Sequence, residues 1–145
     1  MTSGAVLALG TAPTYGAAIT EHDALTLISD VGIEGDRHAG KKRAVSIVCI
    51  GELARAATDF GNQQFDGLRT RRNIVVDLDE LPRTHGARFT IGKVELAVWR
   101  DCAPCNLMDE IFGDGAQAAL RQRAGITASV VLGGIVRLGD VLALA

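Results

Sequence analysis

The sequence is poor in the residues that mark several specialised protein classes, and each shortage narrows the possibilities. Of its 145 residues, three are cysteines and 4% are aromatic. A small, odd number of cysteines, in a chain whose N-terminus does not resemble a secretory signal, argues against a disulfide framework. The apolar runs are short and interrupted by glycine, so we expect no membrane-spanning segment and a cytoplasmic location.

The charge and hydrophobic content are those of an ordinary globular protein. The formal net charge is −2, and 48% of the residues are hydrophobic. No overall positive field favours binding to nucleic acid or to an anionic membrane surface. The length suits one domain with its own core, so we expect a single domain over residues 1–145.

Short β-strands separated by glycine-rich turns are predicted along most of the chain, because β-branched and apolar residues recur between turn signals. In residues 89–98, Gly92-Lys93 predicts a tight hairpin turn of type II′. Gly133-Gly134 predicts a second tight turn that returns the strand at 126–132 along 135–138. Residues 22–29 are ambiguous. Further strands are expected near residues 5–9, 43–50, 74–76 and 141–144.

Two segments have helical spacing instead. Apolar residues between Ile50 and Ala57 recur every three or four positions, and Gly61-Asn62 supplies a stop. Residues 106–122 are also helical in period, and glycines at 113 and 115 should divide them. We expect about seven short strands and one or two helices, connected mostly as a meander. Strands this short must close on themselves or pack face to face to hide their unpaired edges. A mainly β fold, as a small distorted β-barrel, is therefore our first prediction, and a β-sandwich is the second.

The segment Cys102-Ala103-Pro104-Cys105 carries the strongest chemical signal. Proline disfavours helix at Ala103, so Cys105 is expected at or near the start of the following helix, where exposed N–H groups would lower its thiol pKa. A zinc site would need two further ligands, and a dithiol redox pair or simple packing are alternatives. Cys49, within an apolar strand, is expected in the core. A single soft thiolate would also suit a metal that arrives with its own organic ligand.

Basic residues gather at the junctions of predicted loops and strands. Residues 69–73 contain three arginines and Asn73, which is a dense local cluster. Arginine binds phosphate and carboxylate groups with two parallel hydrogen bonds, so the cluster predicts an anionic ligand. Asn73 could bind an amide-like ligand edge or cap a turn.

Several segments, in the same order along the chain, resemble motifs of MOSC domains, which are named after the C-terminal domain of molybdenum cofactor sulfurases. The resemblance runs from about residue 32 to 144. The family often has Arg-Gly-Gly where this chain has Arg123-Ala124-Gly125. The similar segments are 32–38 (GIEGDRH), 72–74 (RNI), 89–96 (FTIGKVEL), 100–105 (RDCAPC), 124–126 (AGI) and 134–140 (GIVRLGD).

This resemblance implies a fold and a cofactor. The fold would be a distorted β-barrel of the MOSC or pyruvate kinase β-barrel type, and the ligand a molybdenum–pterin cofactor. Cys105 would either ligate molybdenum or carry sulfur. The residues expected around the cofactor are Arg37, His38, Arg71, Arg72, Asn73, Arg100 and Arg123.

Three functions remain open at this stage. The domain could support reduction of N-hydroxylated compounds, with electrons from a partner protein, since its cysteines cannot supply a four-thiolate cluster. It could instead carry sulfur as a Cys105 persulfide or handle the cofactor, in which case any pyridoxal phosphate would belong to a cysteine desulfurase partner. The third possibility is a thiol-redox or binding module that uses no molybdenum and forms a reversible Cys102–Cys105 disulfide. No nucleic-acid or membrane partner is expected.

Overall fold

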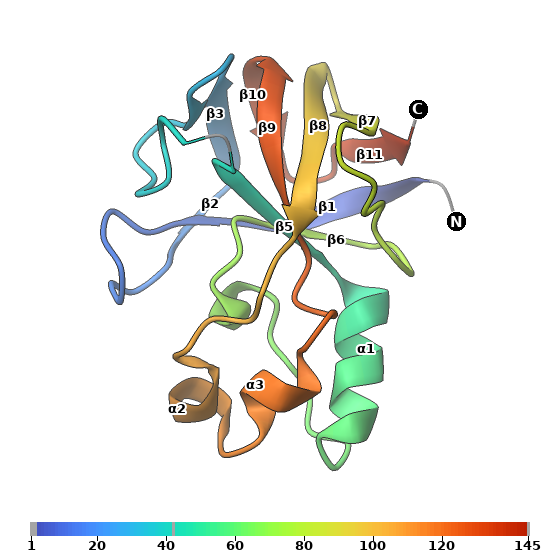
Figure 1. Cartoon of the computed structure of the whole chain (residues 1–145). Coiled ribbons are helices and arrows are strands. Elements are labelled where there is room, and N and C mark those ends of the chain that lie inside the picture. The colour runs from blue at the N-terminus through green and yellow to red at the C-terminus, as the bar shows by residue number, and fades with distance from the viewer. Residues whose placement is uncertain (1–2, 42, 145) are drawn as a thin grey trace.

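The computed structural model describes residues 3–41 and 43–144, and its largest sheet closes on itself (Figure 1). Neighbouring strands around this sheet are hydrogen-bonded, and the last strand returns to the first through pairing between Ser3–Ala5 and Val141–Ala143. The predicted distorted barrel is therefore confirmed, and the sandwich alternative is not. In order around the barrel, the strands are β11 (Val141–Leu144), β7 (Arg88–Ile91), β8 (Val94–Asp101), β9 (Ile126–Leu132), β5 (Val45–Cys49), β6 (Ile74–Val76) and β1 (Ser3–Thr11).

Strand β5 is buried on both faces, which explains its continuous apolar sequence. Val45, Ile47 and Cys49 face the barrel interior, whereas Val48 faces a second apolar cluster outside it. β5 pairs in parallel with β6 and antiparallel with β9. A parallel pair requires a crossover, so the connection from β5 to β6 departs from the mostly meander order that the sequence predicted.

The hairpin of β7 and β8 follows the sequence prediction. Ile91 pairs with Val94 across the turn, and Gly92 has φ 58°, as the first central residue of a type II′ turn requires. β8 continues to Asp101 and delivers the chain to the cysteines.

The second predicted hairpin is wrong. After β9 the chain does not fold back on that strand; β10 (Gly134–Arg137) pairs instead with β3 (Ala24–Ile28) in a separate small sheet. A Cβ atom at Gly133 would lie 2.4 Å from the carbonyl oxygen of Leu27, so glycine permits this close crossing. The ambiguous segment 22–29 forms β3 and the end of β2 (Thr20–His22), and β4 (Gly32–Ile33) completes the small sheet.

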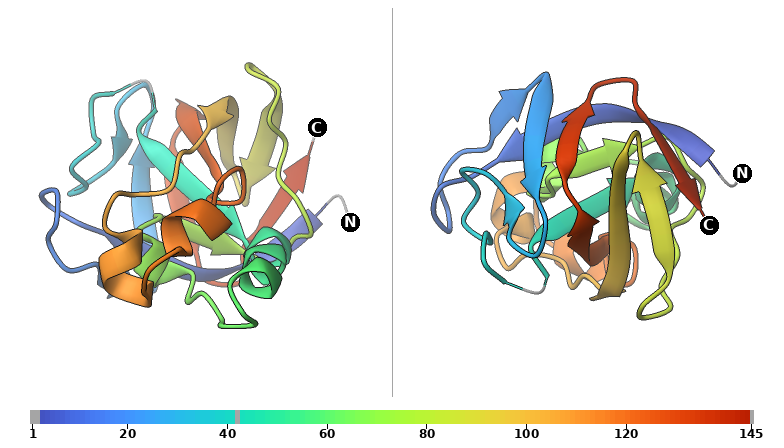
Figure 2. Two further views of the ribbon diagram at one scale, coloured as in Figure 1. Left: turned by 60° about the horizontal axis from the view of Figure 1, so that its bottom comes forward. Right: turned by 90° about the horizontal axis from the view of Figure 1, so that it is seen from above.

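Helices cover one end of the barrel, at the bottom of Figure 1 and nearest the viewer in the left view of Figure 2. The largest, α1 (Ile50–Asp59), follows β5 directly and ends at Gly61 and Asn62, both at positive φ. The second helical segment is divided as predicted into α2 (Met108–Phe112) and α3 (Ala116–Ala119), and a 3-10 turn, η1 (Leu68–Thr70), precedes β6.

These helices and the outer face of β5 and β6 enclose the second apolar cluster. It contains Val48, Leu53, Phe65 and Met108 among its buried members, and Cys105 packs against it. The cysteine is thus held over a core that is separate from the barrel interior. Among the described residues, no helix has the length and apolar content needed to cross a membrane.

Candidate functional site

Three loops meet beside η1 on one side of the barrel. The backbone N–H of Arg37 donates to the carbonyl oxygen of Ala12 at 2.9 Å, which joins loop 34–41 to loop 12–19. The Arg37 guanidinium lies 5.2 Å from the centre of the Tyr15 ring. The third loop comprises residues 102–107, which we call the cysteine segment. It meets loop 12–19 because Tyr15 and Cys105 are close enough to interact.

The cysteine segment is irregular backbone held at its start by Gly125, the residue before β9. Cys102 donates its N–H to the carbonyl oxygen of Gly125 at 2.9 Å, and Met108 donates to Cys105 at 3.1 Å. Helix α2 begins at Met108 and is five residues long. Cys105 was expected at or near the start of this helix, and it lies three residues before the helix begins. Cys105 remains half-buried and is a free thiol.

Arg72 is a buried support of the cysteine segment. Its Nε donates to the carbonyl oxygen of Ala124 at 2.7 Å, and its Nη2 donates to that of Ala103 at 2.6 Å. Only 7% of the residue is exposed. Arg72, predicted from sequence to bind cofactor, thus binds backbone carbonyl groups on both sides of the site.

The departure from the family's Arg-Gly-Gly pattern is accommodated. Ala124 is buried in the second apolar cluster. The close backbone approach occurs one residue later, where a Cβ atom at Gly125 would lie 1.9 Å from the carbonyl oxygen of Ile47. Gly125 also has φ 91°, so glycine is required at this position and not at 124.

Asn73 is saturated by internal hydrogen bonds. Its Oδ1 accepts from the N–H and the hydroxyl of Ser46, both at 3.0 Å, and its Nδ2 donates to the carbonyl oxygen of Gly10 and to Asp36. The residue is 4% exposed. We conclude that Asn73 ties β5, β1 and loop 34–41 together.

Asp36 was not singled out from the sequence, yet it organises two loops. Its carboxylate accepts from the N–H groups of Ala12 at 3.1 Å and His38 at 3.2 Å, and the His38 ring nitrogen lies 3.5 Å away. Although burial alone would raise the pKa of Asp36, the hydrogen bonds from His38 and Ala12 hold it below its ordinary value. The position of Asp36 inside the GIEGDRH motif was the available signal.

Arg71, next to Arg72, has different surroundings. It ends η1 with a left-handed backbone at φ 67°. Its Nε and Nη2 atoms are buried and, within residues 3–41 and 43–144, have no hydrogen-bond partner. Buried donors without partners are rare and costly, so an acceptor placed at these atoms would stabilise the guanidinium group.

Tyr15 lies close to both Arg37 and the Cys105 thiol, and the sequence analysis missed it. The negative charge that Cys105 acquires on ionisation, together with a hydrogen bond between the two side chains, raises the pKa of Tyr15, whereas Arg37 and Arg71 counteract the shift. The structure therefore brings Tyr15, Arg37, Arg71 and Cys105 together. No sequence motif indicated Tyr15, which lies in an irregular loop.

The remaining two predicted arginines lie elsewhere. Arg123 pairs with Asp59 and donates to the carbonyl oxygen of Arg55, on the side of α1. Arg100 is exposed on β8, and its charge lowers the pKa of Cys102, whose thiol pKa is raised chiefly by burial. Neither interaction places these arginines beside Tyr15 and Cys105.

Cys49 has the core position expected for it. It is fully buried, and its sulfur donates to Oε2 of Glu52 at 3.3 Å. Burial raises the pKa of its thiol to about 12. Cys49 is therefore a poor nucleophile, and Cys105 is the better placed of the two.

A hollow of about 480 Å³ is lined by Ala103, Pro104 and Asn106 of the cysteine segment, and two others contain charged residues described above. One of these two, of about 390 Å³, is lined by two arginines, two carboxylates and three apolar residues: Arg69, Arg71, Glu21, Asp66, Ile19, Leu68 and Ile111. The other, of about 640 Å³, lies beside Glu52, Arg83 and Asp101. The former adjoins Arg71, whose donors lack partners, whereas the latter is lined by paired charges.

Comparison with known proteins gives a consistent result. A family model described as the MOSC domain matches residues 34–143. No curated protein matches the chain. The fold resembles that of the YuaD protein from Bacillus subtilis, with a TM-score of 0.81, 21% identity, and coverage of 97% of this chain and 94% of that one.

Two further solved structures have the same fold and are larger. YiiM from Escherichia coli has a TM-score of 0.70 and 24% identity, over 100% of this chain and 70% of that one. YiiM from Geobacillus stearothermophilus has a TM-score of 0.71 and 14% identity, over 98% of this chain and 73% of that one.

Proposed function

This chain belongs to the MOSC domain family, and we propose that it binds a molybdenum–pterin cofactor, with Cys105 as the protein ligand of the metal. The family is associated with molybdenum cofactor biology. Molybdenum is a thiophilic metal, and a half-buried free thiol is a suitable ligand for it.

The observation that carries the proposal is the state of Arg71. Two of its guanidinium nitrogens are buried and lack a partner within the described part of the chain. A phosphate group, such as the one on the pterin cofactor, would accept both hydrogen bonds and neutralise the charge. Arg37, which lies over Tyr15 close to the same thiol, would add a second cation.

Other predicted residues would act on the cofactor indirectly. Arg72 would hold the cysteine segment, and Asn73 with Asp36 would hold the loops that carry Tyr15 and Arg37. His38 would contribute through Asp36. When bound, the cofactor would supply redox chemistry, which in this family could serve reduction of N-hydroxylated compounds with electrons from a partner protein.

The sulfur-carrier alternative uses the same thiol but does not require Arg71. A persulfide on Cys105 would receive its sulfur from a desulfurase partner, and a phosphate-binding arginine would have no part in holding it. The two functions are therefore separated by the effect of an Arg71 substitution.

Metal and pterin content of the purified protein tests the proposal. The chain would be expressed in a host that makes molybdenum cofactor, and molybdenum would be measured alongside the fluorescence of the oxidised pterin. We expect both in the wild type, loss of both in Cys105→Ser, and at least about tenfold lower content in Arg71→Met, since charge-assisted hydrogen bonds contribute roughly 1.5–3 kcal/mol each.

Arg88→Met is the matched control, because Arg88 is an exposed arginine already paired with Glu95 on the barrel. It should retain the wild-type content. A wild type that contains neither molybdenum nor pterin, but forms a persulfide on Cys105, would contradict cofactor binding and favour the carrier function.

A further inference from the structure

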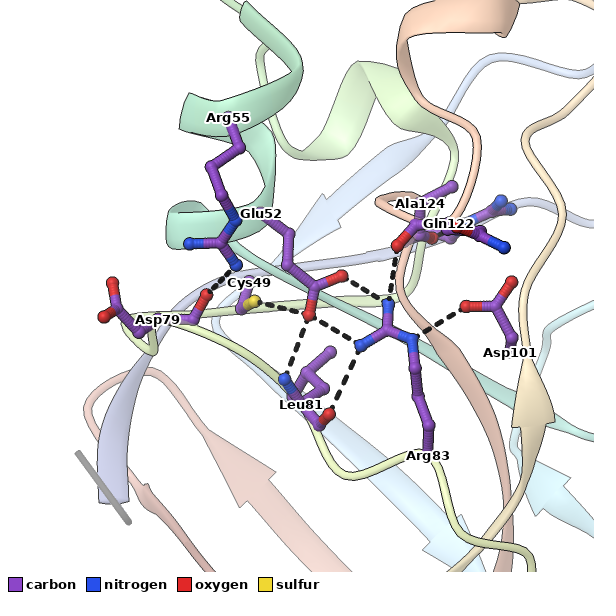
Figure 3. A network of polar contacts seen from close by, with 10 residues as sticks. Cys49, Glu52, Arg55, Asp79, Leu81, Arg83, Asp101, Gln122 and Ala124 are labelled. Atoms are coloured by element: carbon purple, nitrogen blue, oxygen red, sulfur yellow. Dashed lines mark hydrogen bonds and ion pairs between the residues drawn. The ribbon is translucent and has the colours of Figure 1, made fainter.

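A second polar network reaches Asp101, the residue before the cysteine segment, and is centred on the buried carboxylate of Glu52 (Figure 3). Glu52 lies in the first turn of α1 and is 3% exposed. It accepts hydrogen bonds from both terminal nitrogens of Arg83, from the N–H of Leu81 at 3.0 Å, and from the thiol of Cys49. Although burial would raise the pKa of Glu52, the hydrogen bond and charge of Arg83 lower it, so the pair is ionic.

Arg83 connects this buried carboxylate to two other segments. Its Nε donates to Oδ1 of Asp101 at 2.8 Å, and its Nη2 also donates to the carbonyl oxygen of Gln122 at 3.2 Å. One guanidinium group therefore bridges α1, the end of β8 and the loop before β9, as Figure 3 shows. Planar guanidinium forks fix such geometry better than a flexible ammonium group would.

Asp101 is the last residue of β8 and directly precedes the cysteine segment. From there, Cys102 is tied to Gly125 and Ala103 to Arg72. The path from Asp101 to Cys105 is thus held at successive points: strand pairing with Ile126 holds the backbone of Asp101, and Arg83 holds its side chain. An arginine that fixes the entry of a loop also restricts where a thiol four residues later can lie.

We propose that Arg83 is a positioning residue for Cys105, which fixes the start of the cysteine segment through Asp101 and anchors it to the buried Glu52. The proposal deepens the function proposed above and rests on the role given there to Cys105. Arg83 itself would touch neither cofactor nor substrate. Its effect would be to keep the thiol in one place relative to Arg71, Arg37 and Tyr15.

The test removes the link to the segment while leaving the Glu52–Arg83 pair intact. Asp101→Ala does this, and Asp101→Asn restores an acceptor for the Arg83 Nε. Glu95→Ala is the matched control, because Glu95 is a carboxylate on the same strand that pairs with an exposed arginine. Replacing Arg83 is avoided, since an unpaired buried Glu52 would endanger folding.

Two readouts do not depend on any bound cofactor. One is hydrogen exchange at the backbone amides of residues 102–107, and the other is the labelling rate of Cys105 by iodoacetamide, resolved by fragmentation mass spectrometry. Because the Arg83 and Asp101 side chains are 31% and 40% exposed, we expect both rates to rise about three- to fivefold in Asp101→Ala. Asp101→Asn should recover most of this change, and Glu95→Ala should leave both rates unaltered.

Rates in Asp101→Ala equal to those of the wild type would overturn the proposal, even if the melting temperature fell, because a merely structural role predicts only that fall. An equal rise in Glu95→Ala would overturn it too. Molybdenum content measured on the same variants reports separately on cofactor binding. Absence of metal in the wild type would contradict the proposed function. The hydrogen-exchange and labelling rates would still decide whether Arg83 positions Cys105.

Discussion

Two polar regions flank the cysteine segment, and they differ in how far their hydrogen-bonding groups are satisfied. The closed side contains Glu52, Arg83 and Asp101, whose charged groups pair with one another. The open side contains Tyr15, Arg37 and Arg71, and there two buried nitrogens of Arg71 have no partner among the described residues. Similar residue types are thus paired with one another on one side and include two unpaired donors on the other.

Consecutive arginines show how the chain produces this difference. Arg72 enters β6 and is buried against backbone carbonyl groups, whereas Arg71 has the left-handed conformation that ends η1. A change of backbone direction between neighbours places the two guanidinium groups in different surroundings. The following predictions test the comparison, from the largest expected effect to the smallest.

The largest expected effect is the difference in chemical reactivity between the thiols of Cys105 and Cys49. With a pKa of about 12, Cys49 has very little thiolate near neutral pH, and it is fully buried. We expect iodoacetamide to label Cys105 at least about 100-fold faster than Cys49 at pH 8, since the thiolate is the reacting form. Peptide mapping after timed labelling measures this ratio. Equal labelling of the two would mean that the core around Cys49 opens readily.

Removing the arginine of the closed side should destabilise the fold strongly. Arg83→Met leaves the Glu52 carboxylate buried without its charge partner, so we expect the free energy of unfolding to fall by about 3 kcal/mol. Urea denaturation measures it. Arg88→Met, which breaks an exposed pair, should change it by less than about 1 kcal/mol. Similar losses in both variants would contradict the importance of the buried network.

The closed side should also make stability sensitive to acid. The folded-state pKa of Glu52 lies below its unfolded value, which is about 4.3. Its contribution to stability is therefore present above about pH 4.3 and is lost as the pH falls through the folded-state pKa. Glu52→Gln should flatten the decline of unfolding free energy between pH 5 and pH 3. An unchanged slope would show that other carboxylates, such as Asp36, dominate it.

Removing the arginine of the open side should hardly affect stability. Arg71→Met eliminates two buried donors that have no partner, so we expect the free energy of unfolding to stay within about 0.5 kcal/mol or to rise. Urea denaturation without cofactor measures this. A loss of unfolding free energy as large as that of Arg83→Met would mean that Arg71 has a structural partner and that its donors are already satisfied.

Most of the barrel could be predicted from the sequence because its signals are local. The alternation in residues 89–98 and the helical spacing after Ile50 each determine one element without reference to distant residues. The pairing of β10 with β3 could not be predicted in this way. It depends on a close approach between Gly133 and Leu27, which lie far apart in the sequence.

The sequence identified several residues of the candidate site but did not show what each of them contacts. Segment order pointed to Cys105 and to the arginines of residues 69–73, but sequence does not reveal which guanidinium groups meet backbone carbonyls. Arg72 was predicted to bind the cofactor, and the structure shows it hydrogen-bonded to the carbonyl oxygens of Ala103 and Ala124. Tyr15 and Arg83 were missed because folding alone brings Tyr15 close to Cys105 and Arg83 to Asp101.

X-ray absorption at the molybdenum edge tests the central claim most directly, because it counts the atoms around the metal. Wild-type protein from a cofactor-producing host would be compared with Cys105→Ser measured in the presence of excess added cofactor, since the variant as purified should have lost it. The account predicts one sulfur neighbour fewer at molybdenum in the variant. Identical sulfur shells in the two proteins would contradict the assignment of Cys105 as the metal ligand.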